Sequence, residues 1–455
     1  MDLLSTMKKI NDIFWSYILT VLLCGTGIFF TFRLRFVQVR KFKEGWKRVF
    51  GGLSLKGERA GKDGMSSFQA LSTAIAAQVG TGNLAGAATA IVSGGPGAIF
   101  WMWVSAFFGM ATIFAEATLS QLFKERVDGE ITGGPAYYIS KGLNNKYLAG
   151  FFSVAIIVAL GFMGNMVQSN SIGSAFSTAF GFEPVIVGII IAIIAGFIFI
   201  GGVGRIASVT EKIVPIMALF YLLGGLVILI LNYTNVLPAF KMIFVGAFKP
   251  EAVLGGAIGV SVKQAIRYGV ARGLFSNEAG MGSTPHAHAV AKVKHPGEQG
   301  TVAIVSVFID TFIVLTMTAL VIISTGALNT GATGIELTQN AFSMGFKSLG
   351  NFGNIFIAIC LLFFAFSTII GWYFFAEANV KYLFGTKHLN IFRLLVLVCI
   401  VVGAALKVDL VWELADTFNG LMVIPNLIAL IFLSSKVNNS LKEYESLKQD
   451  YIDYE

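Results

Sequence analysis

The stretch Gln78-Val79-Gly80-Thr81-Gly82-Asn83 decides how this chain folds. It interrupts an apolar segment, residues 68–92, that is long enough to cross a membrane. Lipid offers no hydrogen bonds to a free backbone group, so a spanning helix keeps its N–H and C=O groups paired internally. Two glycines and three polar side chains in mid-segment therefore predict that the helix breaks there, at a place enclosed by protein.

A second break is predicted at Phe275-Ser276-Asn277-Glu278-Ala279-Gly280, within the apolar segment 254–285. Here an ionisable side chain and a glycine stand where an unbroken spanning helix would carry apolar residues. Interruptions at corresponding places in two halves of a chain are a sequence sign of the binding site of a secondary transporter.

The composition is that of a polytopic membrane protein. Of the 455 residues 55% are hydrophobic and 13% charged, and the mean hydropathy is +0.76. The sequence predicts an all-α fold with about eleven transmembrane helices. The expected spans are residues 12–32, 68–92, 97–123, 148–176, 184–203, 210–232, 254–285, 299–326, 352–383, 391–407 and 412–434.

The distribution of basic residues predicts the orientation. With residues 33–67 in the cytoplasm, the cytoplasmic segments hold 24 of the 33 Lys and Arg residues and the outer segments hold 6. The positive-inside rule then places the N-terminus outside and the C-terminus in the cytoplasm, in a multi-pass protein of the cell membrane. The net charge of +8 faces lipid at the cytoplasmic leaflet, which argues against nucleic-acid binding.

The positions of the breaks predict an internal repeat. With the first helix set aside, ten spans divide into five and five, and each group of five begins with a broken span. An odd number of spans per half inverts one half relative to the other, which predicts the five-plus-five inverted repeat of LeuT-type transporters with one additional N-terminal helix. The expected organisation is residues 1–66 for the N-terminal helix and basic cytoplasmic loop, 67–235 for the first repeat, 236–435 for the second repeat and 436–455 for a cytoplasmic tail.

The first break predicts a site for both an anion and a cation. Freed N–H groups at Thr81 and Gly82 can hold a carboxylate, and freed carbonyls near Ala76 and Val79 can hold a cation. Simple close packing of helices is an alternative. A nucleotide loop is another, although the glycine spacing misses the dinucleotide pattern and no strand precedes it.

Glu278 is the residue that is most costly to place in a membrane, at about 2.5–3.5 kcal/mol for an acidic side chain at the centre of a span. It is a candidate partner for a ligand ammonium, a cation or a proton, with Asn277 and Gly280 beside it in an unwound segment. The alternative is a structural ion pair with Arg267 or Arg272.

The ninth span carries a second candidate cluster. Ser367 and Thr368 are adjacent hydroxyls in the helix that supplies sodium ligands in the LeuT architecture, although such pairs also bond to carbonyls of their own helix. Trp372 lies one turn further on the same face, where it either walls the pocket or packs in the core. In the fourth span, Gln168 is a candidate pocket contact.

Two further acids have a role that the sequence leaves open, and two histidines lack the neighbours of a metal site. Glu116 and Asp310 are intramembrane acids that fit either a proton or cation site or a hydrogen-bonded structural role. His286 and His288 lie two residues apart without a Cys or carboxylate cluster, so we expect them at the cytoplasmic rim of the membrane.

The motifs resemble those of the alanine or glycine:cation symporter (AGCS) family over nearly the whole chain. The matching stretches are Gly80-Thr81-Gly82-Asn83-Leu84-Ala85-Gly86, residues 94–103 (GGPGAIFWMW), Gly133-Gly134-Pro135 and residues 275–283 (FSNEAGMGS). The resemblance implies a substrate carboxylate at Thr81 and Gly82, a polar end formed by Gln168, Asn277 and Glu278, and Phe275 and Trp372 closing around the substrate side chain.

The expected function is sodium-coupled symport of a small neutral amino acid, alanine or glycine first, into the cell by alternating access. Sodium is the co-transported ion and no chemical bond changes, so the chain is not expected to be an enzyme. The alternatives are a carrier that is proton-coupled or prefers glutamine, a channel, and a polytopic membrane enzyme.

Overall fold

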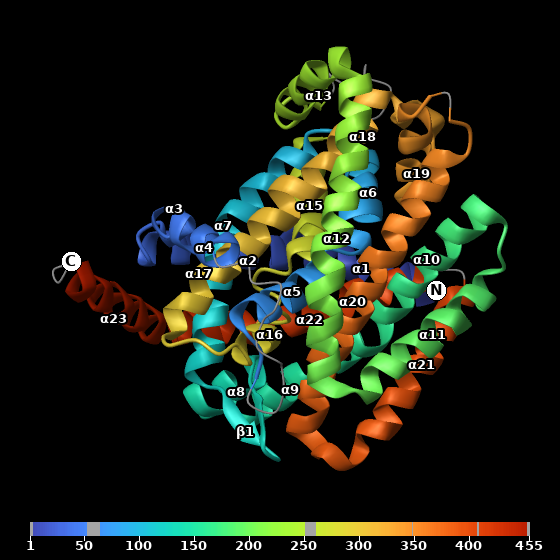
Figure 1. The fold of residues 1–455 in the computed structure, drawn as a ribbon. Helices are drawn as coiled ribbons and strands as arrows, with labels where there is room; N and C mark the ends of the chain where they lie inside the picture. The colour runs from blue at the N-terminus through green and yellow to red at the C-terminus, as the bar shows by residue number, and fades with distance from the viewer. Residues whose placement is uncertain (1–2, 52–63, 251–260, 348, 407–408, 453–455) are drawn as a thin grey trace.

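The computed structural model describes residues 3–51, 64–250, 261–347, 349–406 and 409–452. The fold is helical apart from one antiparallel hairpin of β1 (Glu125–Val127) and β2 (Glu130–Thr132). The expectation of an all-α protein is therefore right except for this hairpin, which lies beside α8 at one end of the bundle (Figure 1).

The helical elements include the π-helical segments η1 to η5 and the 3-10 segments η6 and η7. In chain order they are α1 (Leu3–Ile13), η1 (Phe14–Leu19), α2 (Thr20–Arg33), α3 (Val37–Arg40), α4 (Phe42–Phe50), α5 (Ser67–Gln78), η2 (Gly82–Gly86), α6 (Ala87–Gly94), α7 (Ala98–Leu122), α8 (Pro135–Tyr137), η3 (Tyr138–Gly142), α9 (Lys146–Ile156), η4 (Ile157–Gly164), α10 (Asn165–Phe180), α11 (Pro184–Ile200), α12 (Gly202–Leu231), α13 (Tyr233–Gly246), α15 (Val262–Asn277), α16 (Pro285–Ala289), α17 (Pro296–Val307), η5 (Phe308–Leu315), α18 (Thr316–Thr325), η6 (Ala327–Thr330), α19 (Gly334–Gly345), α20 (Phe352–Phe384), η7 (Thr386–His388), α21 (Leu389–Ala405), α22 (Asp409–Phe432) and α23 (Ser434–Ile452).

Eight helical segments within the described residues are long and apolar enough to cross a membrane. A ninth candidate is the pair α5 and η2–α6, which bends by 48° at its break. Two expected spans fall short of this test, because α11 has 17 residues and the expected span 254–285 contains a helix that begins at Val262 and ends at Asn277. Residues 251–260 of that span lie outside the described residues. The count of eleven spans therefore stays a prediction.

The two halves of the chain are interleaved rather than side by side. The first-half helix α7 packs on α15 and α17, and α10 packs on α20 and α21. Figure 1 shows this mixing as early and late colours alternating through the bundle. Two helices, α13 and α19, occupy stretches that were expected to be connecting loops.

Residues near both ends of the chain form helices outside the bundle core. The stretch expected as a basic loop contains α3 and α4, and the expected tail forms α23, which projects from the body of the bundle (Figure 1). Tyr444 of α23 is buried and stacks on His295 at 5.2 Å between ring centroids. Burial and the Glu44 carboxylate raise the pKa of Tyr444, so its hydroxyl stays protonated and donates a hydrogen bond to Glu44.

Close packing of α5 on α20 generates a first prediction. A Cβ added to Gly371 would lie 2.9 Å from Ala77 Cβ and 3.1 Å from Ala77 Cα, so Gly371→Ala forces the two helices apart. Overpacking of this kind costs about 1–3 kcal/mol, and we expect a lower melting temperature for the detergent-solubilised protein.

Gly25→Ala in α2 is the matched control, because a Cβ there would meet nothing within 4 Å. Alanine is the better helix former, so this variant should melt at the wild-type temperature or slightly above it. Equal melting temperatures for the two variants would contradict the packing argument.

Candidate functional site

The first predicted break is present and takes its shape from a neighbouring helix. α5 ends at Gln78 and the chain resumes as η2 at Gly82. A Cβ on Gly80 would lie 2.3 Å from Thr368 Oγ1 and 3.1 Å from Thr368 Cβ, so any other residue at this position would have to displace the Thr368 side chain of α20.

The second predicted break is also present. α15 ends at Asn277, and Glu278 adopts left-handed backbone angles with φ of +58°. Gly280 and Gly282 follow with φ of +85° and +82°, and helix resumes as α16 at Pro285. This sharp turn exposes backbone N–H groups that an unbroken helix would pair.

The two breaks lie against each other. A Cβ on Gly82 would be 3.0 Å from Ser276 Cα, and Gln78 Nε2 donates to the Asn277 carbonyl at 2.7 Å. Asp310 completes the junction, because its carboxylate accepts from Asn83 Nδ2 at 2.7 Å and from Ser276 Oγ at 2.9 Å. The role that the sequence left open for Asp310 therefore includes a structural part, which joins the two interrupted helices.

The expected cation ligands are brought together. Thr368 Oγ1 lies 3.0 Å from the Ala76 carbonyl oxygen and 3.4 Å from that of Val79, and Ser367 Oγ lies 3.2 Å from the Ala76 oxygen. Both hydroxyls also bond to the Phe364 carbonyl of their own helix, at 2.9 and 3.0 Å. Ser367 and Thr368 therefore contact α5 and also bond within their own helix, so both interpretations of this pair hold.

Glu278 is fully buried and faces Trp372 rather than an arginine. Its carboxylate accepts from Trp372 Nε1 at 2.5 Å and from Ser283 Oγ at 2.5 Å. The alternative of a structural ion pair is wrong for the two residues that were considered, because Arg272 pairs with Asp416 at 2.9 Å and Arg267 pairs with Asp12.

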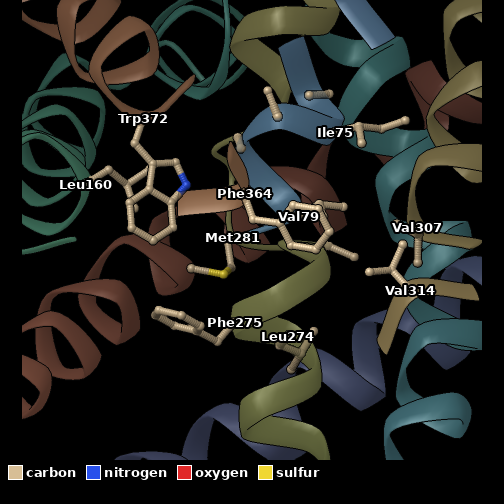
Figure 2. Close-up of a cluster of buried hydrophobic side chains, with 14 of the residues drawn as sticks. Ile75, Val79, Leu160, Leu274, Phe275, Met281, Val307, Val314, Phe364 and Trp372 are labelled. Atoms are coloured by element: carbon tan, nitrogen blue, oxygen red, sulfur yellow. The ribbon is translucent and has the colours of Figure 1, made fainter. Parts of the chain in front are cut away.

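Aromatic side chains cover the site on the side of Arg272. The ring of Phe275 meets Trp372 edge to face at 6.0 Å and lies 5.5 Å from Trp412, and the Arg272 guanidinium lies over Trp412 at 5.5 Å. Figure 2 shows Phe275, Met281 and Trp372 among the apolar side chains around the breaks. A cavity of about 470 Å³ is lined by Arg272 and Trp412 and also by Lys8 and Asp409, which are exposed.

Gln168 lies at the first break, as expected. Its Oε1 accepts from the Thr81 N–H at 3.2 Å, whereas Asn170 points elsewhere and donates to the carbonyls of Gly403 and Leu406. Among the described residues, the buried atoms Thr81 Oγ1 and Gln78 Oε1 have no hydrogen-bond partner. Buried polar atoms without partners are costly, so these two are available to a polar ligand.

Glu116 holds the second break. Its carboxylate accepts from the N–H groups of Gly280 and Gly282, each at 2.9 Å, and from Asn426 Nδ2 at 2.7 Å. Asn426 also donates to the Gly280 carbonyl at 2.9 Å, and its Oδ1 accepts from Tyr138. The freed N–H groups of this turn are therefore already bound to a protein carboxylate.

The expectation that His286 and His288 lie at the cytoplasmic rim of the membrane stays a prediction. Both are buried, because the short α16 packs against α5, α7 and α20. His286 contacts the Ser283 carbonyl at 2.6 Å and Asn379 at 2.8 Å, and His288 contacts Gln299 at 2.8 Å. Through its contact with Ser283, His286 packs against the segment that directly follows the second break.

Three polar partners at these breaks escaped the sequence reasoning. They are Ser276, which meets Asp310; Asn426, which meets Glu116; and Asp416, which meets Arg272. Asn426 and Asp416 gave a usable signal, since each is a polar residue inside the apolar segment 412–434. Their partners could not be read from the sequence, because they lie at least 144 residues away in the chain.

The arrangement of helices is similar to that of a solved structure. A crystal structure of MhsT in complex with L-phenylalanine superposes with a TM-score of 0.59 at 13% identity, covering 83% of this chain and 90% of that one. The chain therefore shares the fold of that structure, and at least eight of its described helical segments are long and apolar enough to cross a membrane.

The chain belongs to the sodium:alanine symporter family, whose model matches residues 1–454. It is 43% identical over 460 residues to the sodium/alanine symporter AgcS of Methanococcus maripaludis, covering 99% of both chains. Two similar proteins of Bacillus subtilis are a probable sodium/glutamine symporter, GlnT, and a putative sodium/proton-dependent alanine carrier, YrbD. GlnT is 43% identical with 96% of this chain and 90% of GlnT covered, and YrbD is 41% identical with 98% and 93% covered.

The contacts of Glu116 generate a second prediction. Glu116→Gln replaces one carboxylate oxygen by an NH₂ group that faces a backbone N–H, so one buried donor loses its acceptor. Leaving such a donor unpaired costs about 1–3 kcal/mol, and the melting temperature should fall. Glu183→Gln, at an exposed carboxylate, is the control and should melt as the wild type does. If both variants melt alike, Glu116 does not hold the break.

Proposed function

We propose that this protein is a secondary active transporter that carries a small neutral amino acid, with alanine and glycine the first candidates, into the cell together with sodium. The observation that carries the proposal is the first break, where backbone groups, two hydroxyls and a buried carboxylate across the junction converge. Membership of the sodium:alanine symporter family supports it.

The sodium site is assigned to the carbonyls of Ala76 and Val79 and the hydroxyls of Ser367 and Thr368. All four donors are hard oxygens, which suit an alkali cation. The oxygens lie 3.0–3.4 Å apart, and the hydroxyl hydrogens that now point at carbonyls can turn away when an ion binds. Sodium there would hold α5 against α20 and fix the shape of the break.

The substrate carboxylate is assigned to the N–H groups at Thr81 and Gly82. This N-terminal end of η2 and α6 carries partial positive charge, and among the described residues the Thr81 N–H is bound by the side chain of Gln168. The corresponding N–H groups of the second break are bound to Glu116. The first break is therefore the better site for a mobile carboxylate.

The substrate ammonium is assigned to Glu278, with Asn277 and the turn at Gly280 completing the polar end. Trp372 and Phe275 limit the space left for a side chain, because the indole also packs on Gly164, where a Cβ would lie 2.5 Å from it. A confined apolar wall favours alanine and glycine over larger amino acids.

The five-plus-five inverted repeat is part of the proposal. Both broken spans start with the same capping box, in which Ser66 and Gln69 exchange hydrogen bonds before α5, and Ser261 and Gln264 do so before α15. Two equivalent starts and two adjoining breaks support two repeats that rock about the site. The proposed orientation keeps the N-terminus outside and the C-terminus in the cytoplasm.

A carrier that prefers glutamine or uses protons is the second candidate, because two similar proteins bear those names. Asp310 is an intramembrane acid that contacts residues of both breaks, Asn83 and Ser276. It accepts hydrogen bonds from Asn83, Ser276 and Thr311. These contacts support a structural role for Asp310 in joining the two breaks, and membership of the sodium:alanine symporter family is what favours sodium as the coupling ion.

The coupling is tested by uptake into proteoliposomes of the purified full chain. Radiolabelled alanine, glycine and glutamine are supplied with an inward sodium gradient, with a pH gradient alone, and with neither. We expect sodium-driven, saturable uptake of alanine or glycine. Uptake driven by the pH gradient without sodium would overturn the sodium assignment, and glutamine as the preferred substrate would overturn the substrate assignment.

Glu278→Gln tests the ammonium site. The amide keeps the size of the side chain but removes the charge that balances the ammonium, so uptake at subsaturating alanine should fall at least about tenfold. Glu183→Gln is the matched control and should transport normally. Unchanged uptake by a folded Glu278→Gln protein rules out this role for Glu278.

Thr368→Val tests the sodium site, since it removes one hydroxyl with little change of shape. The sodium concentration for half-maximal uptake should rise about tenfold or more, because one of few ligands is lost. Thr325→Val is the control, since the Thr325 hydroxyl donates to the Val321 and Ile322 carbonyls of its own helix. An unchanged sodium dependence in Thr368→Val contradicts the assignment.

A further inference from the structure

Helix α22 carries a row of three residues, Trp412, Asn419 and Asn426, along the second break. They are spaced seven residues apart, so they lie on one face of the helix at successive steps of two turns. Trp412 contacts Phe275, which precedes the break, at 5.5 Å between ring centroids. Asn426 donates to the carbonyl of Gly280, inside the turn that follows, at 2.9 Å. Asn419 lies midway between these two contacts and is therefore opposite the break itself.

The adjoining face of α22 packs on the helix that supplies the glutamine of the first break. Ala415, one turn before Asn419, belongs to a small buried cluster with Met166 and Val167 at the start of α10. Gln168 follows directly in α10 and accepts from the backbone of the first break. Asn419 thus lies on the part of α22 that faces both α10 and α15, which are the helices that flank the proposed substrate site.

The Asn419 amide is buried and unpaired. The residue is 1% exposed, and neither its Oδ1 nor its Nδ2 has a hydrogen-bond partner among the described residues. Polar residues beside it on α22 are bonded, since Asp416 pairs with Arg272 at 2.9 Å and Asn426 Nδ2 donates to Glu116 at 2.7 Å. Burying an amide with both groups unpaired is costly, and an apolar residue of the same size would avoid that cost. An asparagine here is explained by a polar ligand that pairs with it.

The position of Asn419 indicates which part of a ligand it meets. The proposed site binds the substrate carboxylate at Thr81 and its ammonium at Glu278, and Phe275 and Trp372 surround the substrate side chain. Because Phe275 also contacts α22, the amide of Asn419 lies toward the side-chain end of the site.

A hydroxyl is the side-chain group that fits best. It can donate to the Oδ1 of Asn419 or accept from its Nδ2, so it pairs with the amide in either orientation of the amide. Serine is larger than alanine by one hydroxyl, whereas glutamine adds several atoms. The indole of Trp372 is packed so closely on Gly164 that a Cβ there would lie 2.5 Å from it, and this wall leaves little room for a long side chain.

We propose that Asn419 is a specificity-determining residue whose amide binds the hydroxyl of L-serine, so that the transporter takes serine as well as alanine. This inference rests on the proposed function, because it uses the sites proposed there for the carboxylate and the ammonium. It adds a contact to the substrate side chain, which those sites leave to apolar rings alone.

The test is direct binding of radiolabelled L-serine and L-alanine to the purified full chain in sodium chloride, followed by scintillation proximity. In the wild type we expect a serine Kd within about tenfold of the alanine Kd, because the amide compensates for burying the hydroxyl. In Asn419→Leu the hydroxyl loses its partner, and the ratio of the serine Kd to the alanine Kd should rise at least about tenfold.

Two further variants and the melting temperature separate specificity from folding. Asn419→Leu removes unpaired buried atoms, so it should melt at the wild-type temperature or above it. Asn419→Ala also lacks the amide but adds no bulk, and it should raise the same ratio if leucine does not fit. Asn439→Leu, at an exposed residue of α23, is the matched control and should keep the wild-type ratio.

Three results would overturn the inference. Binding of alanine without measurable binding of serine removes the role of Asn419 and leaves the proposed transport of alanine standing. An equal loss of affinity for both amino acids in the Asn419 variants, or an unchanged ratio, reduces Asn419 to a packing residue. A wild type that binds neither amino acid in sodium overturns the proposed function and this inference together.

Discussion

The junction between the two interrupted helices is the contact on which the rest of this structure depends. Asp310 accepts hydrogen bonds from Asn83 on one side and Ser276 on the other, and Gln78 reaches the Asn277 carbonyl across the same seam. A helix broken within a membrane leaves polar backbone groups that lipid cannot satisfy. The breaks persist because each is enclosed by the other and by polar side chains from α7, α10, α17–η5 and α20.

The two breaks satisfy their backbone groups in different ways, and that difference separates structure from function. At the second break, Glu116 and Asn426 bind the turn from within the protein, and the Glu116 carboxyl group accepts three hydrogen bonds of 2.7–2.9 Å. At the first break, the Thr81 N–H meets a neutral amide, and a buried hydroxyl has no partner among the described residues. A ligand carboxylate can compete with a neutral acceptor far more easily than with a buried carboxylate. The proposed substrate site follows from this asymmetry.

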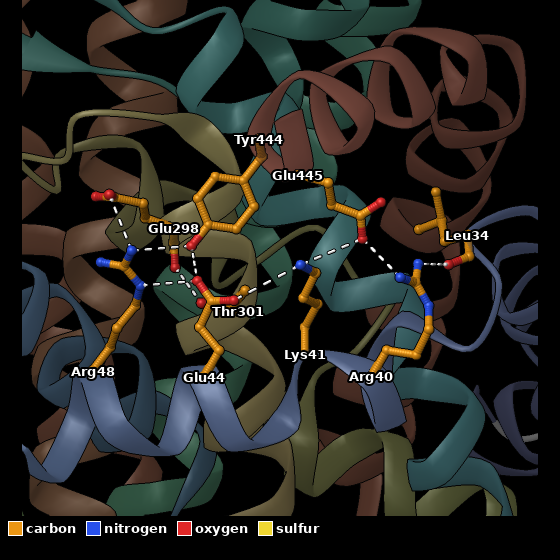
Figure 3. A network of polar contacts seen from close by, with 9 residues as sticks. All are labelled: Leu34, Arg40, Lys41, Glu44, Arg48, Glu298, Thr301, Tyr444 and Glu445. Atoms are coloured by element: carbon orange, nitrogen blue, oxygen red, sulfur yellow. Dashed lines mark hydrogen bonds and ion pairs between the residues drawn. The ribbon is translucent and has the colours of Figure 1, made fainter. Parts of the chain in front are cut away.

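The surroundings of the junction also differ between its two ends. On one side a cavity reaches the aromatic cover of Phe275 and Trp412, where Arg272 and Asp416 pair. On the other side α16 fills the space, with His286 held between Ser283 and Asn379. Outside the bundle core, α4 and α23 are joined by polar contacts, in which Lys41 pairs with Glu445 and Arg48 bonds to Tyr444 (Figure 3). An open approach on one side of a buried site and dense packing on the other is the arrangement that alternating access requires.

The sequence by itself determined where the helices break, which residues the breaks contain and that the chain lies in a membrane, because glycine and polar residues inside an apolar segment have a strong local cost. It also singled out Ser367 and Thr368, Glu278 and Gln168, each from its position in a span. Only the tertiary structure decided what these residues meet. It paired Arg272 with Asp416 instead of Glu278, buried His286 and His288, gave Glu116 to the second break and joined both breaks through Asp310. Those contacts join residues far apart in the chain, and they depend on how helices pack, which no local pattern of residues encodes.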